Sequence, residues 1–255
     1  TYVAKKIAEI APHDSQERFE EMGVTVLRDY AQFKDPKTVI VGNSEITARR
    51  IVLATGSRAK IPNIKGLDKV NYLTNESLFD LRKSPRHLAI IGGGPIGVEM
   101  AQAHARLGVK TTIIEINTIM QGYERRVVEP IKKSLINDGV NILEGTVVDR
   151  VEKDKSDIKL HLSSANALVV SDLLLAAGRV PNIEKLALAE AGIKYNELGV
   201  VVDRNLQTTN RSVYAIGDLV DGPSFTHTAS YHAGIVIKKM LFGLSSKMQT
   251  IHIPQ

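Results

Sequence analysis

The chain contains no cysteine and no tryptophan among its 255 residues, and only 5 Phe and 7 Tyr. Without cysteine, these residues cannot form a disulfide framework, a thiolate metal site or a cysteine nucleophile. No apolar run approaches the roughly 18 residues of a transmembrane helix. The net charge is +5, but the basic residues are dispersed and aromatic residues are sparse, which argues against a nucleic-acid partner. We therefore expect a cytoplasmic globular protein that binds neither membranes nor nucleic acids.

A leader segment is also missing from these residues. The sequence starts at Thr1 in a helical pattern, with neither the basic region nor the apolar region of a secretory signal. We expect it to be an internal piece of a longer protein.

The most informative segment is a glycine-rich turn. An apolar run, His87–Ile91, leads directly into Gly92, Gly94 and Gly97, which form a G-x-G-x-x-G pattern at the start of a helical pattern. In such a turn the first glycine permits the tight bend, the second lets the backbone approach a pyrophosphate, and the third lets the helix pack close to the strand. Pro95 fits the first helical position, where its missing N–H costs nothing. The segment predicts a dinucleotide-binding turn.

A second apolar run ends in an acidic residue at a suitable distance. Residues 111–114 lead to Glu115, close to the roughly 20-residue offset at which an acid meets the adenosine ribose. A carboxylate accepts two ribose hydroxyls and repels the extra phosphate of NADP, and residues 116–118 supply no cation. Arg125 and Arg126 lie farther along and are expected to be a solvated helix start. The pattern favours NAD over NADP.

The order of the patterns predicts an α/β fold. We expect a helix over residues 1–22, a small β-ribbon after it, and one strand over residues 45–57. From residue 86 we expect a Rossmann-like unit with βαβ units and an antiparallel excursion. Its elements are a helix over 95–107, a strand over 111–114, a helix over 124–137 kinked by or beginning at Pro130, a strand over 141–144, the excursion over 146–170 and a returning strand over 172–178.

Four motifs in this order resemble those of the pyridine nucleotide-disulfide oxidoreductases, the flavoenzyme family of dihydrolipoamide dehydrogenase, glutathione reductase and mercuric reductase. They are Ala54-Thr55-Gly56-Ser57, the turn over 92–99, Gly178-Arg179-Val180-Pro181-Asn182 and Tyr214-Ala215-Ile216-Gly217-Asp218. Residues 10–19 are most similar to the mercuric reductase-like branch. The resemblance implies an NAD-binding domain over 85–207 and a partial FAD-binding domain in two parts, 1–84 and 208–255.

The resemblance also implies cofactor-binding residues, and we expect neither a catalytic nor a metal-binding residue in this chain. His227 and His232 are expected to flank a flavin-side helix rather than act as bases. On the NAD side the implied residues are Gly92, Gly94, Pro95, Ile96 and Gly97 at the pyrophosphate, Glu115 at the ribose, Glu99 near the nicotinamide, Val147 or Val148 at the adenine, and Gly178 with Arg179 on the returning strand. On the FAD side they are Asp218 at the ribitol, with Thr55, Gly56 and Thr226 near the flavin nucleotide.

In the family, NADH passes hydride to the flavin, which reduces a disulfide and through it the substrate. An N-terminal FAD-binding glycine motif, a redox cysteine pair and an interface domain with a catalytic His-Glu pair are not found in these residues. We therefore expect this piece alone to be inactive and its parent to be a homodimer whose acceptor, lipoamide, mercuric ion or another disulfide, stays open. Two alternatives remain: a non-catalytic NAD-binding module, which would not need Asp218, and a cysteine-independent FAD/NAD reductase.

Overall fold

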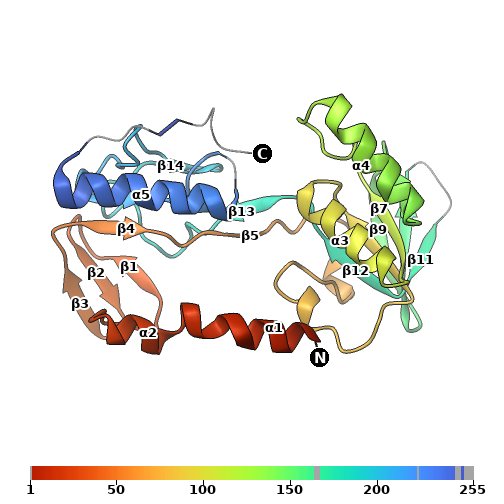
Figure 1. Ribbon diagram of the computed structural model, residues 1–255, viewed down its shortest axis with the longest axis horizontal. Coiled ribbons are helices and arrows are strands. Elements are labelled where there is room, and N and C mark those ends of the chain that lie inside the picture. The colour runs from red at the N-terminus through yellow and green to blue at the C-terminus, as the bar shows by residue number, and fades with distance from the viewer. Residues whose placement is uncertain (1, 164–166, 223, 245–247, 250–255) are drawn as a thin grey trace. The chain divides into compact units, whose positions relative to one another are not determined.

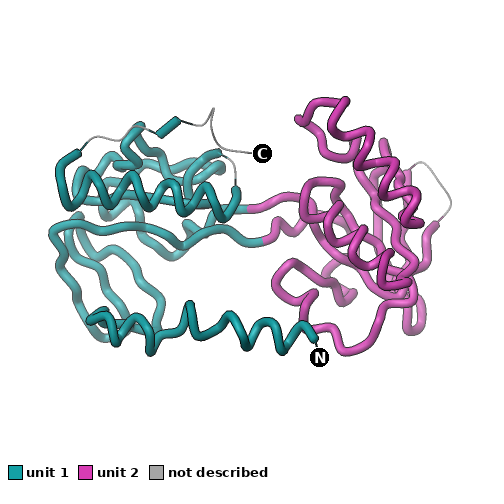
Figure 2. The backbone as a smooth tube through the Cα atoms, in the orientation of Figure 1, with its two compact units in different colours: residues 1–58, 180–255 teal, residues 59–179 magenta. Residues whose placement is uncertain are grey.

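The computed structural model describes residues 2–163, 167–222, 224–244 and 248–249. The chain forms two compact units, one of residues 1–58 with 180–255 and one of residues 59–179 (Figure 2). The units therefore divide at different places from the limits of 84 and 207 expected from the sequence. Residues 59–84 belong to the second unit because they pair with its strands, through β-bridges between Lys65 and Arg150 and between Leu73 and Leu174.

The second unit has three layers around a parallel sheet with strand order β12-β6-β7-β8 (Figure 1). The sheet strands are β6 (His87–Ile91), β7 (Lys110–Ile114), β8 (Asn141–Leu143) and β12 (Asp172–Leu175). One face is covered by helices α3 (Pro95–Arg106) and α4 (Arg125–Asn137). The other is covered by an antiparallel sheet of β9 (Val148–Asp154), β10 (Asp157–Leu162) and β11 (Leu168–Val170). The expected parallel α/β sheet and its antiparallel excursion are confirmed.

The central strand β6 is buried on both faces. Leu88 and Ile90 pack with the helix layer, whereas Ala89 and Ile91 pack with the antiparallel sheet. Such a strand is nearly all apolar rather than alternating, here over residues 88–91, so the sequence pattern indicates it. Each fully buried Leu or Ile side chain contributes about 1.5–3 kcal/mol, so this strand is a rigid support for the turn that follows it.

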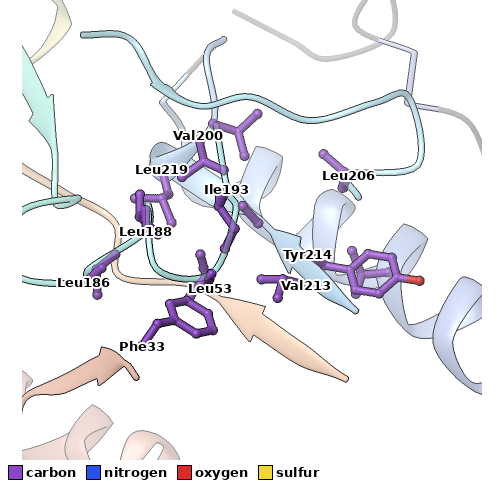
Figure 3. Close-up of a cluster of buried hydrophobic side chains, with 14 of the residues drawn as sticks. Phe33, Leu53, Leu186, Leu188, Ile193, Val200, Leu206, Val213, Tyr214 and Leu219 are labelled. Carbon is purple, nitrogen blue, oxygen red and sulfur yellow. The ribbon is translucent and has the colours of Figure 1, made fainter. Parts of the chain in front are cut away.

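The first unit combines an antiparallel sheet, a short parallel pair and a long helix. A cluster of buried residues that includes Phe33, Leu53, Val213 and Leu219 forms its core (Figure 3). The antiparallel sheet contains β1 (Ala31–Phe33), β2 (Thr38–Val41) and β3 (Ser44–Thr47); the parallel pair is β4 (Ile51–Leu53) with β16 (Val213–Ala215); the helices are α1 (Tyr2–Ile10), α2 (Gln16–Glu21) and α5 (Thr226–Phe242).

Short elements complete the chain. Two two-stranded pairs are β5 (Ser57–Ala59) with β13 (Arg179–Pro181) and β14 (Tyr195–Asn196) with β15 (Gly199–Val200). The 3₁₀ helices are η1 (Ala11–Asp14), η2 (Leu67–Lys69), η3 (Leu78–Asp80) and η4 (Gly217–Leu219).

Two expected elements of the first unit are wrong. The helix expected over 1–22 is broken by η1, which contains Pro12, a residue without the N–H that a continuous helix needs. A new helix, α2, then begins after Ser15, whose Oγ accepts the N–H of Arg18 at 3.2 Å. The strand expected over 45–57 is three strands, β3, β4 and β5, which pair with different partners.

The helix around Pro130 begins at Arg125, so it does not begin at the proline, which lies inside it. Pro130 removes the one backbone hydrogen bond that its N–H would have donated toward Arg126. Val128 and Leu135, both buried, anchor the helix on either side of the proline. Packing of the apolar face therefore outweighs the loss of one bond.

Candidate nucleotide-binding site

The glycine turn lies at the carboxyl end of β6 and opens α3, with Gly94 as the residue that caps the helix. Gly92 has φ of 112°, and a Cβ there would lie 2.2 Å from the Ala176 carbonyl oxygen. A Cβ at Gly97 would lie 2.0 Å from the Gly92 carbonyl oxygen. These two glycines are therefore required by the chain itself, one for the bend and one for the close approach of helix and strand.

Neither backbone strain nor a close contact within the protein requires glycine at position 94. Its φ of −75° suits any residue, and no atom lies within 4 Å of the position that a Cβ would take. The space lies in front of a helix N-terminus, where the first N–H groups have no partner in the helix and favour an anion. A pyrophosphate fits this cradle, and a methyl group would fill part of it.

Glu115 follows β7, the neighbour of β6, and its half-buried carboxylate faces the turn. One oxygen accepts the N–H of Gly93 at 2.7 Å and the other the N–H of Asn117 at 2.9 Å. A carboxylate offers about four acceptor positions, so two remain for the hydroxyls of a ribose. The acid and the turn thus form one connected structure.

Gly93 belongs to this site, although the sequence analysis did not single it out. Besides its bond to Glu115, a Cβ at Gly93 would lie 2.8 Å from Cγ2 of Ile119 and 3.2 Å from the Glu115 side chain. The unbroken run of three glycines over 92–94 was the signal that could have found it.

Two cations that follow Glu115 in the chain form ion pairs. Lys132 forms an ion pair with Glu144, and Arg126 forms one with Glu124. The second oxygen of Glu144 accepts the N–H of Ile119 at 2.9 Å. Burial raises the pKa of Glu144, but the hydrogen bonds from Lys132 and Ile119 outweigh it, so the pKa lies below its usual value. This charged pair holds the loop that follows Glu115.

The adenine-side candidates differ in accessibility. The Thr146 N–H donates to the Glu115 carbonyl at 3.0 Å, which places the start of β9 beside the acid. Val148 is only 6% exposed and packs in the core, whereas Val147 is 39% exposed. Of the two, Val147 offers the surface on which a base could lie.

The remaining candidates of this unit lie on α3 and after β12. Pro95 and Ile96, both half-buried, form the first helical turn, and Glu99 is exposed one turn later. Gly178 has φ of 109° and its carbonyl accepts the N–H of Lys60 at 3.0 Å. Arg179, which begins β13, is half-buried.

The flavin-side candidates lie in the first unit. Thr55 and Gly56 follow β4, and Asp218 follows the parallel strand β16, so they share one edge. Ser57 donates its hydroxyl to Asp218 at 2.6 Å. Thr226 is exposed as the first residue of α5.

The two histidines of α5 differ in burial and in their contacts. His227 is exposed and stacks on Phe225, with ring centroids 5.1 Å apart. His232 is 4% exposed, and its Nδ1 accepts the N–H of Gly217 at 3.2 Å. Burial lowers the pKa of His232, so it supports the Gly217 turn as a neutral ring.

Metal-binding clusters and membrane-spanning helices are both absent from the described part of the chain. Within those residues, no three His, Asp or Glu side chains are grouped so that they could hold a metal ion. None of the helices described there is long and apolar enough to cross a membrane.

The sequence has clear relatives among curated proteins. It is 35% identical to a mercuric reductase of Bacillus cereus over 240 residues, which cover 92% of this chain and 38% of the relative. It is 32% identical to a dihydrolipoyl dehydrogenase of Geobacillus stearothermophilus over 241 residues, or 91% of this chain and 51% of the relative. The chain thus spans about half or less of the length of these relatives.

The structure is similar to that of a solved flavoprotein. The HOCl-induced flavoprotein disulfide reductase RclA from Escherichia coli matches with a TM-score of 0.81 and 32% identity, over 86% of this chain and 51% of that one. The model of the pyridine nucleotide-disulphide oxidoreductase family matches residues 4–233. With that match over most of its length, the chain belongs to the pyridine nucleotide-disulphide oxidoreductase family.

Proposed function

We propose that this chain is the NAD(H)-binding central region of an FAD-dependent oxidoreductase. The observation that carries the proposal is the open cradle at Gly94, next to a carboxylate on Glu115 with acceptor positions to spare. The cradle suits a pyrophosphate and the carboxylate suits a ribose, and the two are joined through Gly93. A site with both groups binds a dinucleotide rather than a simple phosphate ester.

The residues of the second unit would bind and orient NADH. The free N–H groups at the start of α3 would hold the pyrophosphate, Glu115 the adenosine ribose and Val147 the adenine face. Glu99, Gly178 and Arg179 would line the nicotinamide side.

The residues of the first unit would hold the flavin nucleotide. Asp218 would accept hydroxyls of the ribitol, because a carboxylate can accept from two O–H donors at once. Thr55, Gly56 and Thr226 would contact the nucleotide. FAD, when bound, supplies the acceptor for the hydride, while the protein supplies orientation and electrostatics.

The finer parts of the proposal rest on the family. We propose that the parent protein passes hydride from NADH to flavin and then to a disulfide, lipoamide or mercuric ion, and that it is a cytoplasmic homodimer. We place no catalytic residue in this chain and therefore propose that it does not turn over alone. The bond between Ser57 and Asp218 supports this view over a pure NAD-binding module, which needs no flavin-side turn.

Two measurements test the proposal. NADH and NADPH are titrated into the chain and followed by nicotinamide fluorescence, with tighter binding of NADH expected. The natural polypeptide that contains this sequence is then isolated for its mass and visible spectrum, and a yellow protein is expected. Failure to bind NADH would refute the nucleotide site, and a colourless polypeptide that binds NADH would favour the NAD-binding module.

A further inference from the structure

We propose that Asn182 is a positioning residue that shapes the Thr55–Gly56 turn for the flavin nucleotide. The proposal rests on the proposed function, because it assumes that this turn contacts FAD. It adds a residue that would act on the cofactor through its neighbours rather than by touching it.

Three hydrogen bonds join Asn182 to the turn. Its side-chain amide donates to the Thr55 carbonyl at 2.9 Å, and its backbone N–H donates to the Gly56 carbonyl at 2.9 Å. In return, the Thr55 hydroxyl donates to the Asn182 carbonyl at 2.8 Å. The two segments are 127 residues apart in the chain, so this reciprocal clamp is a purely tertiary feature.

Besides the clamp, the turn is flanked by two strand pairs, β4 with β16 before it and β5 with β13 after it. The pairing of β4 with β16 ends at Leu53 and Ala215, and the last bond there runs from the Ile216 N–H to the Leu53 carbonyl at 3.0 Å. Gly56 has φ of 65° and no atom within 4 Å of where a Cβ would be. Thr55 is exposed. Between these two strand pairs, the clamp adds the contacts that restrict Thr55 and Gly56 themselves.

The clamp also bears on the acid that would meet the ribitol. Ser57 follows the clamped Gly56 directly and donates to Asp218. A shift of Gly56 would therefore move the Ser57 hydroxyl relative to the Asp218 carboxylate.

Arg58 sets the orientation of the Asn182 side chain. It forms a two-pronged ion pair with Glu184, and its Nη1 donates to Oδ1 of Asn182 at 3.0 Å. A guanidinium has donors only, so it requires the amide oxygen on its side. The amide nitrogen is then left facing the Thr55 carbonyl.

The test uses the natural polypeptide that contains this chain, freed of its flavin. In Asn182→Asp the donor to Thr55 is lost, while an oxygen remains for Arg58; Asn182→Ala removes both. Asn210→Asp is the matched control, because its amide donates to Pro36 and Ala191 carbonyls at 2.8 and 3.0 Å and it precedes β16, at the opposite end of the strand pair. FAD affinity is measured by flavin fluorescence, together with the flavin visible spectrum, NADH affinity and the Tm of each apoprotein.

We expect both Asn182 variants to bind FAD about tenfold more weakly, as loss of one hydrogen bond implies. In the Asn182 variants the visible absorption band of the flavin should shift, while the NADH affinity stays unchanged. The Asn210→Asp control should bind FAD within twofold of the unaltered protein, even where its loss of Tm is similar to that of the Asn182 variants. FAD binding by the Asn182 variants within twofold of the unaltered protein would overturn the inference. The inference would also be overturned if Asn210→Asp lost as much FAD affinity as the Asn182 variants at the same loss of Tm. If the unaltered protein binds no FAD, the flavin part of the proposed function itself fails.

Discussion

Gly93 donates its backbone N–H to the carboxylate of Glu115 at 2.7 Å. The acid expected at the ribose is therefore held by the same glycine turn that is expected to hold the pyrophosphate. This hydrogen bond joins the two parts of the proposed nucleotide site, so changes at either are expected to alter the geometry of both.

Replacement of Glu115 should change the choice of nicotinamide cofactor. Glu115→Arg removes the acceptor for the ribose hydroxyls and adds a cation for a 2′-phosphate, so we expect the preference to move from NADH toward NADPH. Hydrogen bonds to charged groups contribute about 1.5–3 kcal/mol, which corresponds to a roughly ten- to hundredfold loss for NADH. Titration of both nucleotides measures the preference.

Glu115→Gln separates loss of the carboxylate from gain of a cation. It should weaken NADH binding without improving NADPH binding. An unchanged preference in Glu115→Arg would show that Glu115 does not meet the ribose.

Two glycines of the same turn should respond oppositely to alanine. In Gly94→Ala the added methyl meets no protein atom, so we expect the free energy of unfolding to change by less than about 1 kcal/mol and NADH affinity to fall at least tenfold. In Gly97→Ala the methyl would lie 2.0 Å from the Gly92 carbonyl oxygen, so we expect a loss of about 1–3 kcal/mol. Urea unfolding and NADH titration distinguish the two, and a Gly94→Ala protein with normal NADH affinity would exclude the cradle.

Two buried histidines should make the protein less stable as the pH falls. Burial lowers the pKa of His232, and burial with the nearby Lys110 lowers that of His87. Above the usual value of 6.5 both are neutral in the folded and unfolded states, and their stabilising contribution is complete. Below it the unfolded chain takes up protons that the folded chain resists, so stability is lost by at most about 1.4 kcal/mol per pH unit for each histidine.

Substitution tests this pH dependence. His232→Asn keeps an acceptor for the Gly217 N–H, and His87→Gln keeps a polar partner for Thr112. Each should reduce the slope of the free energy of unfolding between pH 7.5 and 5. If both variants keep the pH slope of the unaltered protein in their free energy of unfolding, the two histidines are not the cause of the pH dependence.

The Lys132–Glu144 pair should contribute stability that disappears in acid. Because the pKa of Glu144 is lowered in the folded state, its contribution is present above its ordinary value of about 4.5 and is lost as the pH falls through the lowered pKa. Lys132→Met leaves Glu144 half-buried without its cation, and we expect a loss of about 1–3 kcal/mol at pH 7. The same loss at pH 3 as at pH 7 would show that the ion pair is not its cause.

Much of the second unit could be predicted from the sequence because its signals are local. A strand buried on both faces is nearly all apolar, as over residues 88–91 of β6, and a glycine turn with a helix start follows it directly. The position of Glu115 at the end of the next strand followed from the same pattern. Their binding of NAD stays a prediction.

Other features could not be predicted because distant residues decide them. Residues 59–84 join the second unit through bridges to strands about 85 and 101 residues away, such as those from Lys65 to Arg150 and from Leu73 to Leu174. Continuation of α4 through Pro130 likewise depends on tertiary contacts, namely the burial of Val128 and Leu135.

By itself the sequence determined the α/β class, the glycine turn, the acid after the second strand and the family. Backbone sterics and burial on both faces restrict the residue types at neighbouring positions, so these features are visible as local sequence patterns. Only the tertiary structure decided where the units divide, that Gly93 holds Glu115 and that Asn182 clamps Thr55. A hydrogen bond between residues 127 apart forms only where the tertiary structure brings the two segments together, and no local sequence pattern indicates such a bond.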